Sequence, residues 1–278
     1  MVSRAGVGLT LAAWLRPFAD GAFSLFFPAD CRICREPLVR ATRLPVCQDC
    51  RDSVVPLRGE FCFICGERIV TFSHTESRTE AKPCVLCRRA APAYARAVAY
   101  GEFEGTLREA IHLLKYDRVH PASRFLGGRV SMALAQLSPP DASGWLVIPV
   151  PLHVSKLRQR GFNQSELIAR AACRRSPVVV SLNAKCLARQ RETASQAGLT
   201  RHQRRENLRG AFAVRDADAV RGRNVLVIDG VFTTGTTISE CARVLRRAGA
   251  ASVYAATVAR ALKADRIGSG KILEAKAA

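Results

Sequence analysis

The fold is decided by one stretch near the carboxyl end of the chain, Val225-Leu226-Val227-Ile228-Asp229-Gly230-Val231-Phe232-Thr233-Thr234-Gly235-Thr236-Thr237. Its first residues are aliphatic without interruption, which predicts a strand at 224–229 that is buried on both faces. The Thr and Gly residues after the strand predict a turn. The segment 236–248 predicts a helix that ends at Gly249. A strand, a tight turn and a helix in this order are typical of an α/β protein.

A turn of this composition at the start of a helix favours phosphate binding. The N–H groups at a helix N-terminus are unpaired and carry partial positive charge, so they attract anions. Asp229, at the end of the strand, is placed to accept hydrogen bonds from sugar hydroxyls or to hold Mg²⁺. Gly230 and Gly235 have the spacing of a Walker P-loop, but the lysine of that loop is missing. A plain strand–turn–helix connection without a ligand stays open as an alternative.

The alternation of strand and helix extends back to about residue 94. Apolar runs predict strands at residues 95–103, 145–150, 178–180, 185–189, 224–229 and 251–258. Apolar positions at helical spacing predict helices at residues 105–117, 122–137, 163–174 and 236–248. Asn163 is the predicted N-cap of the third helix. We therefore expect an α/β fold with a mainly parallel sheet covered on both faces.

The amino-terminal part is rich in cysteine. Eight of the 11 cysteines form four Cys-x-x-Cys pairs: Cys31, Cys34, Cys47, Cys50, Cys62, Cys65, Cys84 and Cys87. Two such pairs supply the four thiolates of a structural zinc site. Pairing in chain order predicts two sites in a small double zinc ribbon, although a cross-braced pairing also fits the spacing. Zinc would supply the stability that so small a region lacks.

A disulfide framework is the alternative use of these cysteines, but it requires an oxidising compartment. The apolar stretch 7–27 is broken by Arg16, Pro17 and Asp20, which argues against a secretory signal. The stretch is typical of a short amphipathic helix. We therefore favour zinc, and we expect the separate cysteines Cys173, Cys186 and Cys241 to be buried thiols.

Length and charge limit the remaining choices. The 278 residues suggest about two domains, and 48% hydrophobic residues exclude wholesale disorder. No uncharged apolar run of 18 residues predicts a transmembrane segment. The net charge of +20 is concentrated in residues 156–209, which hold 13 Lys and Arg against 3 Asp and Glu. That excess indicates phosphates or nucleic acid as partners, unless it only reflects a general preference for arginine.

The loop 229–237 is similar to the signature of type I phosphoribosyltransferases, in which two adjacent acids precede two variable residues and a Thr/Gly loop. The chain as a whole, over about residues 23–260, resembles the ComF family of bacterial competence proteins. The residues that carry this resemblance are the cysteine-rich start with Phe27-Pro28, the segments 148–152 and 160–164, Gln196 before Leu199, Arg205 near Asn207, the segment 210–212 and the loop.

The resemblance implies roles for individual residues. Thr233, Thr234, Gly235, Thr236 and Thr237 would cradle the 5-phosphate of phosphoribosyl pyrophosphate. Asp229 would contact the ribose hydroxyls and would be the catalytic residue, with Mg²⁺ and basic side chains stabilising the pyrophosphate. The turn after Pro151 would form the pyrophosphate side of the site; its basic residues are Lys156, Arg158 and Arg160. The segment 191–207 would be a mobile loop over the site.

One position departs from the family pattern. Gly230 replaces the second acid, so one ribose or metal contact is expected to be lost. The first hypothesis is therefore a weakly enzymatic or non-enzymatic competence protein that acts in DNA uptake, with phosphoribosyl pyrophosphate, a nucleotide or single-stranded DNA and the competence machinery as partners. The second is an active phosphoribosyltransferase in nucleobase or nucleotide salvage. A zinc-ribbon binding module alone would leave the α/β part unexplained.

The expected organisation has four parts: an amphipathic segment at residues 1–27, the double zinc ribbon at 28–92, the phosphoribosyltransferase-like domain at 93–265 and a tail at 266–278. The resemblance implies a cytoplasmic protein, for which partners would provide a route to association with a membrane.

Overall fold

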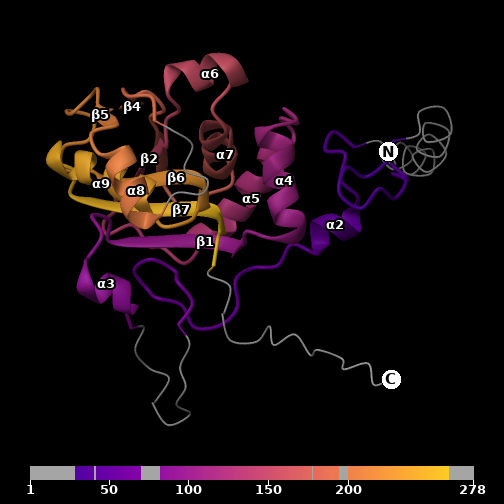
Figure 1. The fold of residues 1–278 in the computed structure, drawn as a ribbon, viewed down its shortest axis with the longest axis horizontal. Coiled ribbons are helices and arrows are strands. Elements are labelled where there is room, and N and C mark those ends of the chain that lie inside the picture. Colours follow the sequence, from indigo (N-terminus) through magenta and orange to yellow (C-terminus); the bar gives the residue numbers. More distant parts are fainter. Residues whose placement is uncertain (1–28, 41, 70–81, 177, 194–199, 263–278) are drawn as a thin grey trace, which may run out of the picture.

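The computed structural model describes residues 29–40, 42–69, 82–176, 178–193 and 200–262. Its centre is a five-stranded sheet (Figure 1). The strands follow the order β1 (Arg96–Glu102), β7 (Ser252–Arg260), β6 (Asn224–Phe232), β2 (Trp145–Pro149) and β3 (Val180–Leu182). Every neighbouring pair is parallel, as the apolar strand patterns predict.

Three helices cover one face of the sheet: α4 (Gly105–Lys115), α5 (Ala122–Leu134) and α7 (Gln164–Cys173). Their buried residues, such as Leu126 and Ile168, pack against Leu226 and Ile228 of β6. Asn163 caps α7 by accepting a hydrogen bond from the Ser165 N–H at 3.0 Å, which confirms the predicted cap.

The opposite face carries α9 (Thr236–Arg247) together with α8 (Arg201–Leu208). Ile238 and Leu245 of α9 pack on Val225 and Val227 of β6. A separate two-stranded antiparallel sheet lies beside them, formed by β4 (Leu187–Arg189) and β5 (Phe212–Val214). Side chains of β6 alternate between the two faces of the sheet. Because helices pack on each face, both faces of this strand are buried.

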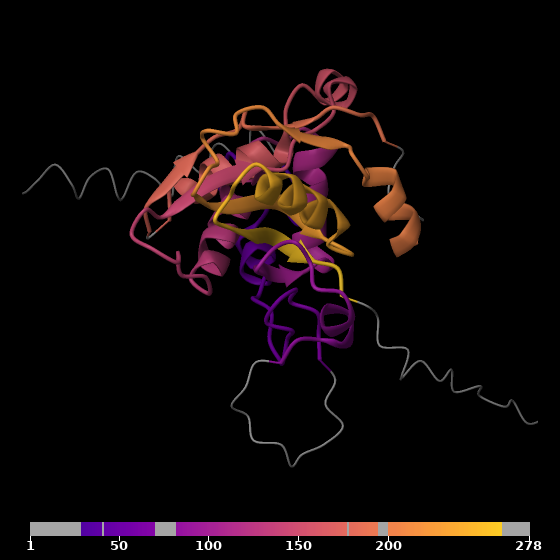
Figure 2. The ribbon, with the colours of Figure 1, turned by 90° about the vertical axis from the view of Figure 1, so that its left-hand side faces the viewer.

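The cysteine-rich part contains two short helices, α2 (Gln48–Asp52) and α3 (Val85–Arg89). Its two halves join different cores. Cys31 and Leu44 pack with the α4–α5 side, whereas Cys62 and Cys87 pack with the α9 side. In Figure 2 these indigo and purple segments lie on the lower side of the α/β domain. The cysteine-rich part is therefore packed against the α/β domain.

Two sequence predictions are wrong in detail. The turn expected after Pro151 contains α6 (Val154–Arg160), and the expected loop at 191–207 contains most of α8. Both helices are short and mostly polar, so neither shows an apolar periodicity that sequence reasoning can use. The predicted segments 1–27 and 266–278 lie outside the described residues, as do 70–81 and 194–199.

Candidate functional site

The Thr/Gly loop joins the end of β6 to the start of α9. Gly235 is the N-cap of α9 and has φ +74°, a conformation that costs other residues about 1–2 kcal/mol. The hydroxyl oxygens of Thr234 and Thr236 lie 2.7 Å apart. The loop thus directs two hydroxyls and the N–H groups at the N-terminus of α9 to one place, as phosphate binding requires.

A pocket of about 880 Å³ opens at this loop. Thr233, Thr234, Gly235 and Thr236 line it, with Ser239 and Glu240 from the following turns of α9. Thr237, predicted as part of the same cradle, does not line the pocket. A volume of this size is typical of a site for a small phosphorylated ligand.

Helix α8 forms the basic wall of this pocket. Arg204 donates a hydrogen bond to the Thr233 hydroxyl at 2.9 Å, and Arg205 and His202 also line the pocket. The helix begins with a capping box in which Thr200 and Gln203 exchange hydrogen bonds. The position of these arginines was missed from the sequence because the segment was predicted to be a loop. Only the resemblance singled out Arg205.

The remaining wall comes from the second cysteine-rich half. Arg260 is 3% exposed and donates hydrogen bonds to the carbonyl of Cys65 and to Glu67, the latter at 3.0 Å. Its guanidinium lies 4.4 Å from the centroid of the Phe232 ring, which in turn contacts Tyr94 edge to face. All five residues line the pocket. Cation–π and buried ion-pair contacts therefore connect the second pair of cysteine motifs to the residue that precedes the loop.

Asp229 does not line this pocket. Its carboxylate accepts hydrogen bonds from the Ser165 hydroxyl at 2.8 Å and from the Gly230 N–H at 2.7 Å. Burial raises the pKa of the Asp229 carboxyl, against the opposing effect of these two bonds and of the Lys115 and Arg189 charges. Asp229 was expected at the end of its strand, but it lies inside β6, which continues to Phe232 past the end of the neighbouring β2. Its carboxylate is already held by the chain, and its predicted contact with ribose stays a prediction.

The space around Gly230 is large enough for the acidic side chain that the family pattern has at this position. A Cβ atom built at this position meets no atom within 4 Å. Its backbone does not adopt the left-handed conformation, since its φ is not positive. The absence of a second acid is therefore a matter of sequence and is not imposed by packing.

The three basic residues predicted to face pyrophosphate lie on α6. Arg160 is partly buried, which lowers the pKa of its guanidinium, and it donates a hydrogen bond to Gln164 at 2.6 Å. Arg158 is exposed and Lys156 is partly exposed. None of the three lines the pocket at the loop. Helix α6 follows β2, which runs parallel to β6, so these residues lie beyond the same sheet edge as Asp229. Their predicted role is open.

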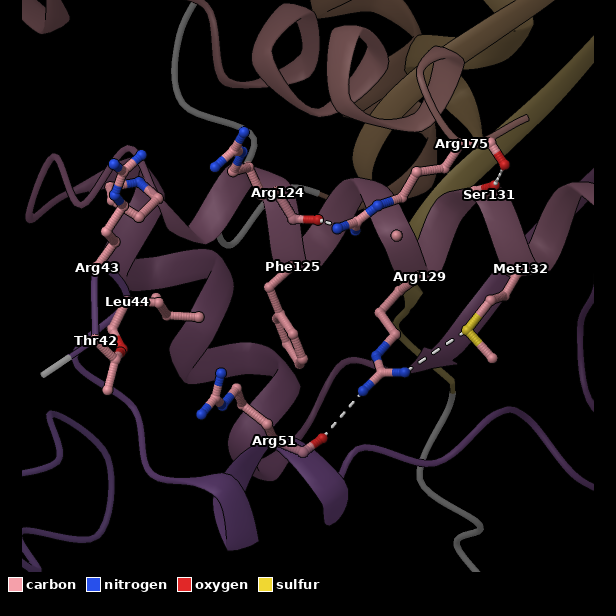
Figure 3. Close-up of a pocket in the computed structure, with 12 residues that line it drawn as sticks. Thr42, Arg43, Leu44, Arg51, Arg124, Phe125, Arg129, Ser131, Met132 and Arg175 are labelled. Atoms are coloured by element: carbon pink, nitrogen blue, oxygen red, sulfur yellow. Dashed lines mark hydrogen bonds between the residues drawn. The ribbon is translucent and has the colours of Figure 1, made fainter. Parts of the chain in front are cut away.

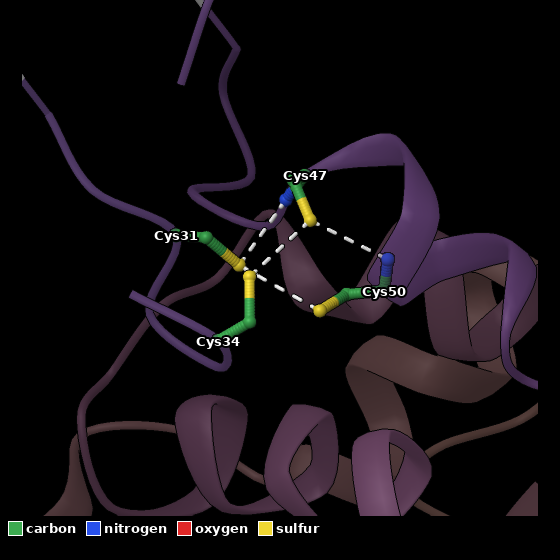
Figure 4. A group of neighbouring side chains, drawn as sticks. All are labelled: Cys31, Cys34, Cys47 and Cys50. Atoms are coloured by element: carbon green, nitrogen blue, oxygen red, sulfur yellow. Dashed lines mark hydrogen bonds between the residues drawn. The ribbon is translucent and has the colours of Figure 1, made fainter. Parts of the chain in front are cut away.

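The eight cysteines form two tetrads in chain order. The first tetrad is Cys31, Cys34, Cys47 and Cys50 (Figure 4); the second is Cys62, Cys65, Cys84 and Cys87. Within each tetrad all sulfur atoms lie within 4.8 Å of one another. The Sγ separations of 3.6 Å for Cys34–Cys47 and 3.8 Å for Cys65–Cys84 match the edge of about 3.8 Å that a tetrahedron with Zn–S bonds of about 2.3 Å requires. The arrangement fits a metal ion and does not show the cross-braced pairing.

One sulfur in each tetrad, that of Cys31 and that of Cys62, accepts a hydrogen bond from a backbone N–H group. Burial raises the pKa of the Cys31 thiol, but backbone N–H donors, that of Cys47 among them, outweigh it and lower the pKa to about 6. The Cys62 thiol, next to the Cys84 N–H at 3.2 Å, has its pKa lowered to about 7 by the same balance. Donors of this kind stabilise the charged form that binds metal. Of the other cysteines, Cys186 and Cys241 are buried as predicted and Cys173 is only partly buried.

Comparison with known proteins is consistent with this geometry. The phosphoribosyl transferase domain family matches residues 165–269. The DNA utilization protein YhgH of Escherichia coli is 30% identical over 244 residues, which cover 86% of this chain and all of the relative. Competence protein F of Haemophilus influenzae is 28% identical over 227 residues, which cover 77% of this chain and 96% of the relative. The chain belongs to the ComF family.

Among solved structures, the PRPP amidotransferase of Bacillus subtilis matches 53% of this chain and 30% of its own, with 18% identity and a TM-score of 0.35. For this ComF-family chain the expected fold class is confirmed: a parallel α/β sheet of the phosphoribosyltransferase type preceded by two cysteine tetrads. Among the described residues no helix has the length and apolar character to cross a membrane.

Proposed function

We propose that this ComF-family protein acts in DNA uptake and utilization, and that its phosphoribosyltransferase-like domain binds a phosphorylated ribose at the loop 233–236. The ligand class is phosphoribosyl pyrophosphate or a nucleotide. The observation that carries the proposal is the pocket in which the N-terminus of α9 and the threonine hydroxyls face Arg204 and Arg205 of α8. The names of the relatives, which refer to DNA utilization and to competence, support the cellular part.

The proposed role is binding, with transfer to a nucleobase as the alternative. Gly230 disfavours transfer because the carboxylate that the family places there is missing. Asp229, held by Ser165 and by the Gly230 N–H, keeps one acid at the sheet edge for a ribose hydroxyl or Mg²⁺. Zinc in both tetrads would be structural, because each offers four sulfur ligands and leaves no open position for a substrate.

Calorimetric titration of the whole protein with phosphoribosyl pyrophosphate and Mg²⁺, and separately with a nucleoside 5′-monophosphate, tests the proposal. We expect Thr234→Ala to weaken binding at least about tenfold, since it removes a charge-assisted hydrogen bond and the hydroxyl partner of Thr236. Thr106→Ala on α4, outside the pocket, is the matched control and should bind like the wild type. Absence of binding by the wild type at millimolar concentrations of either ligand would contradict the proposal.

The cellular part is tested by replacing the chromosomal gene with the Thr234→Ala variant in the bacterium that carries it. We expect uptake or use of external DNA to fall, whereas the Thr106→Ala strain should behave like the wild type. An unchanged phenotype in a strain that has lost ligand binding would separate the pocket from the role in DNA uptake.

A further inference from the structure

A second hollow lies away from the loop, between the first cysteine-rich half and α5. Its volume is about 650 Å³. The wall from the cysteine-rich part is formed by Thr42, Arg43, Leu44 and Arg51, and the wall from the α/β domain by Pro121, Arg124, Phe125, Gly128, Arg129, Ser131, Met132 and Arg175. We call it the arginine groove. Helix α5 covers the face of the sheet opposite to α9, so the groove is a different site from the pocket at the loop.

Among the described residues that line it, the groove gathers five guanidinium groups and no carboxylate. They belong to Arg43, Arg51, Arg124, Arg129 and Arg175, which surround the Phe125 side chain in Figure 3. Within the described part of the chain, no ion pair involves any of them. Five like charges without counterions repel one another, and a bound anion would reduce this repulsion. The arrangement therefore favours anion binding.

Contacts with the chain hold two of these cations, Arg129 and Arg175, in place. Arg129 donates a hydrogen bond to the Arg51 carbonyl at 3.1 Å, and its guanidinium lies 4.8 Å from the Phe125 ring centroid and 5.1 Å from that of Tyr100. Arg175 donates to the Arg124 carbonyl at 2.8 Å. The two walls of the groove are thus joined across 78 residues of sequence. Guanidinium groups fixed in this way lose less conformational entropy when an anion binds.

We propose that the arginine groove binds the phosphate groups of a single-stranded nucleic acid. Several separated cations along one hollow match a chain of phosphates better than one phosphate ion, which needs only one or two of them. Arg43, Arg124 and Arg175 are exposed and accessible from solvent. In the described part of the chain the groove is a hollow from which no helix projects as it would to enter a duplex groove, so it suits a flexible strand and not B-form DNA. Arg129 lies over the Phe125 ring, and the part of this ring that stays exposed supplies an apolar surface for a base.

Fluorescence anisotropy with a labelled oligothymidylate of about 20 nucleotides tests this proposal on the whole protein. The variant Arg43→Gln/Arg124→Gln/Arg175→Gln removes three exposed charges and keeps side chains of similar length. We expect its affinity to fall at least about tenfold. The plot of log affinity against log salt concentration should become less steep by about 2, since each phosphate contact with a single strand contributes about 0.7.

The matched control is Arg215→Gln/Arg221→Gln/Arg247→Gln, which removes the same charge from exposed positions outside the groove. Equal weakening by the two triple variants would overturn the proposal, because only net charge would then matter. Full competition by millimolar inorganic phosphate at constant ionic strength would also overturn it, because it would indicate a site for a small anion. Tighter binding of a duplex of the same length would do the same. Circular dichroism and zinc content of both variants should match the wild type, and a groove variant that fails either check is replaced by the single Arg124→Gln.

The groove and the pocket at the loop are tested separately. Thr234→Ala should leave binding of the oligonucleotide unchanged, and the groove variant should leave binding of phosphoribosyl pyrophosphate unchanged. Loss of both activities in either variant would contradict the assignment of two distinct sites.

Discussion

At the scale of single residues, the structure requires glycine at position 235 but not at position 230. Gly235 has a positive φ, and a Cβ there would lie 2.5 Å from Cζ of Phe232. Gly230 has no positive φ, and a Cβ there would meet no atom within 4 Å. We expect Gly230→Asp to fold like the wild type, with a midpoint temperature changed by no more than about 3 °C, and to bind phosphoribosyl pyrophosphate with Mg²⁺ about tenfold more tightly because a second carboxylate becomes available.

Gly235→Ala is the matched comparison for this experiment. It should lose ligand binding and destabilise the protein by about 1–2 kcal/mol, since alanine is strained at positive φ. Calorimetric titration and thermal unfolding measure both effects. If Gly230→Asp leaves affinity unchanged, the site does not use the position that carries the family's second acid.

At the scale of elements, α8 depends on its N-cap because its sequence is highly polar. Thr200 and Gln203 form the capping box, and the helix carries Arg204 to Thr233. Thr200→Ala should destabilise the helix by about 1 kcal/mol. Amide hydrogen exchange within 201–208 should then become about fivefold faster, and phosphate-ligand affinity should fall by a few fold. Thr200→Ser keeps the hydroxyl and should change neither, whereas equal exchange in all three proteins would mean that the cap does not limit this helix.

At the scale of the whole molecule, each cysteine tetrad is packed into a core that it shares with the α/β domain. If both tetrads hold zinc, the purified protein contains two zinc ions per chain. Cys87→Ser should reduce this to one, because a structural site needs all four thiolates. Unfolding in urea should begin at lower concentration, since the second tetrad supports Arg260 and the pocket wall.

Metal analysis of the purified variants measures this stoichiometry. Cys186→Ser is the control: Cys186 is 1% exposed and belongs to neither tetrad, so this variant should keep two zinc ions. Retention of two ions by Cys87→Ser would show that the second tetrad does not bind metal through four sulfur atoms.

Much of the architecture follows from local patterns in the chain. The buried strand that begins at Asn224 and the helix after it were predicted correctly because apolar runs and helical spacing are local properties. The end of the strand, predicted at Asp229, lies at Phe232. The in-order tetrads were one of two pairings that the spacing allowed. Helices α6 and α8 were missed, since short polar helices have no apolar stripe and owe their position to neighbouring elements.

The α/β class, the phosphate-type loop and the four cysteine motifs can be recognised from the amino-acid sequence alone, because each is encoded in residues close together in the chain. The residues that surround them come from distant parts of the chain and are known only from the folded structure. Folding brings Arg260 to Cys65, 195 residues away in sequence, and Arg204 to Thr233. It also gathers five arginines, at positions between 43 and 175, around the arginine groove. The basic excess at 156–209 was the sequence signal for an anionic partner, yet only one of the groove's five arginines comes from it. Charges distant in sequence become one site only when packing brings their elements together.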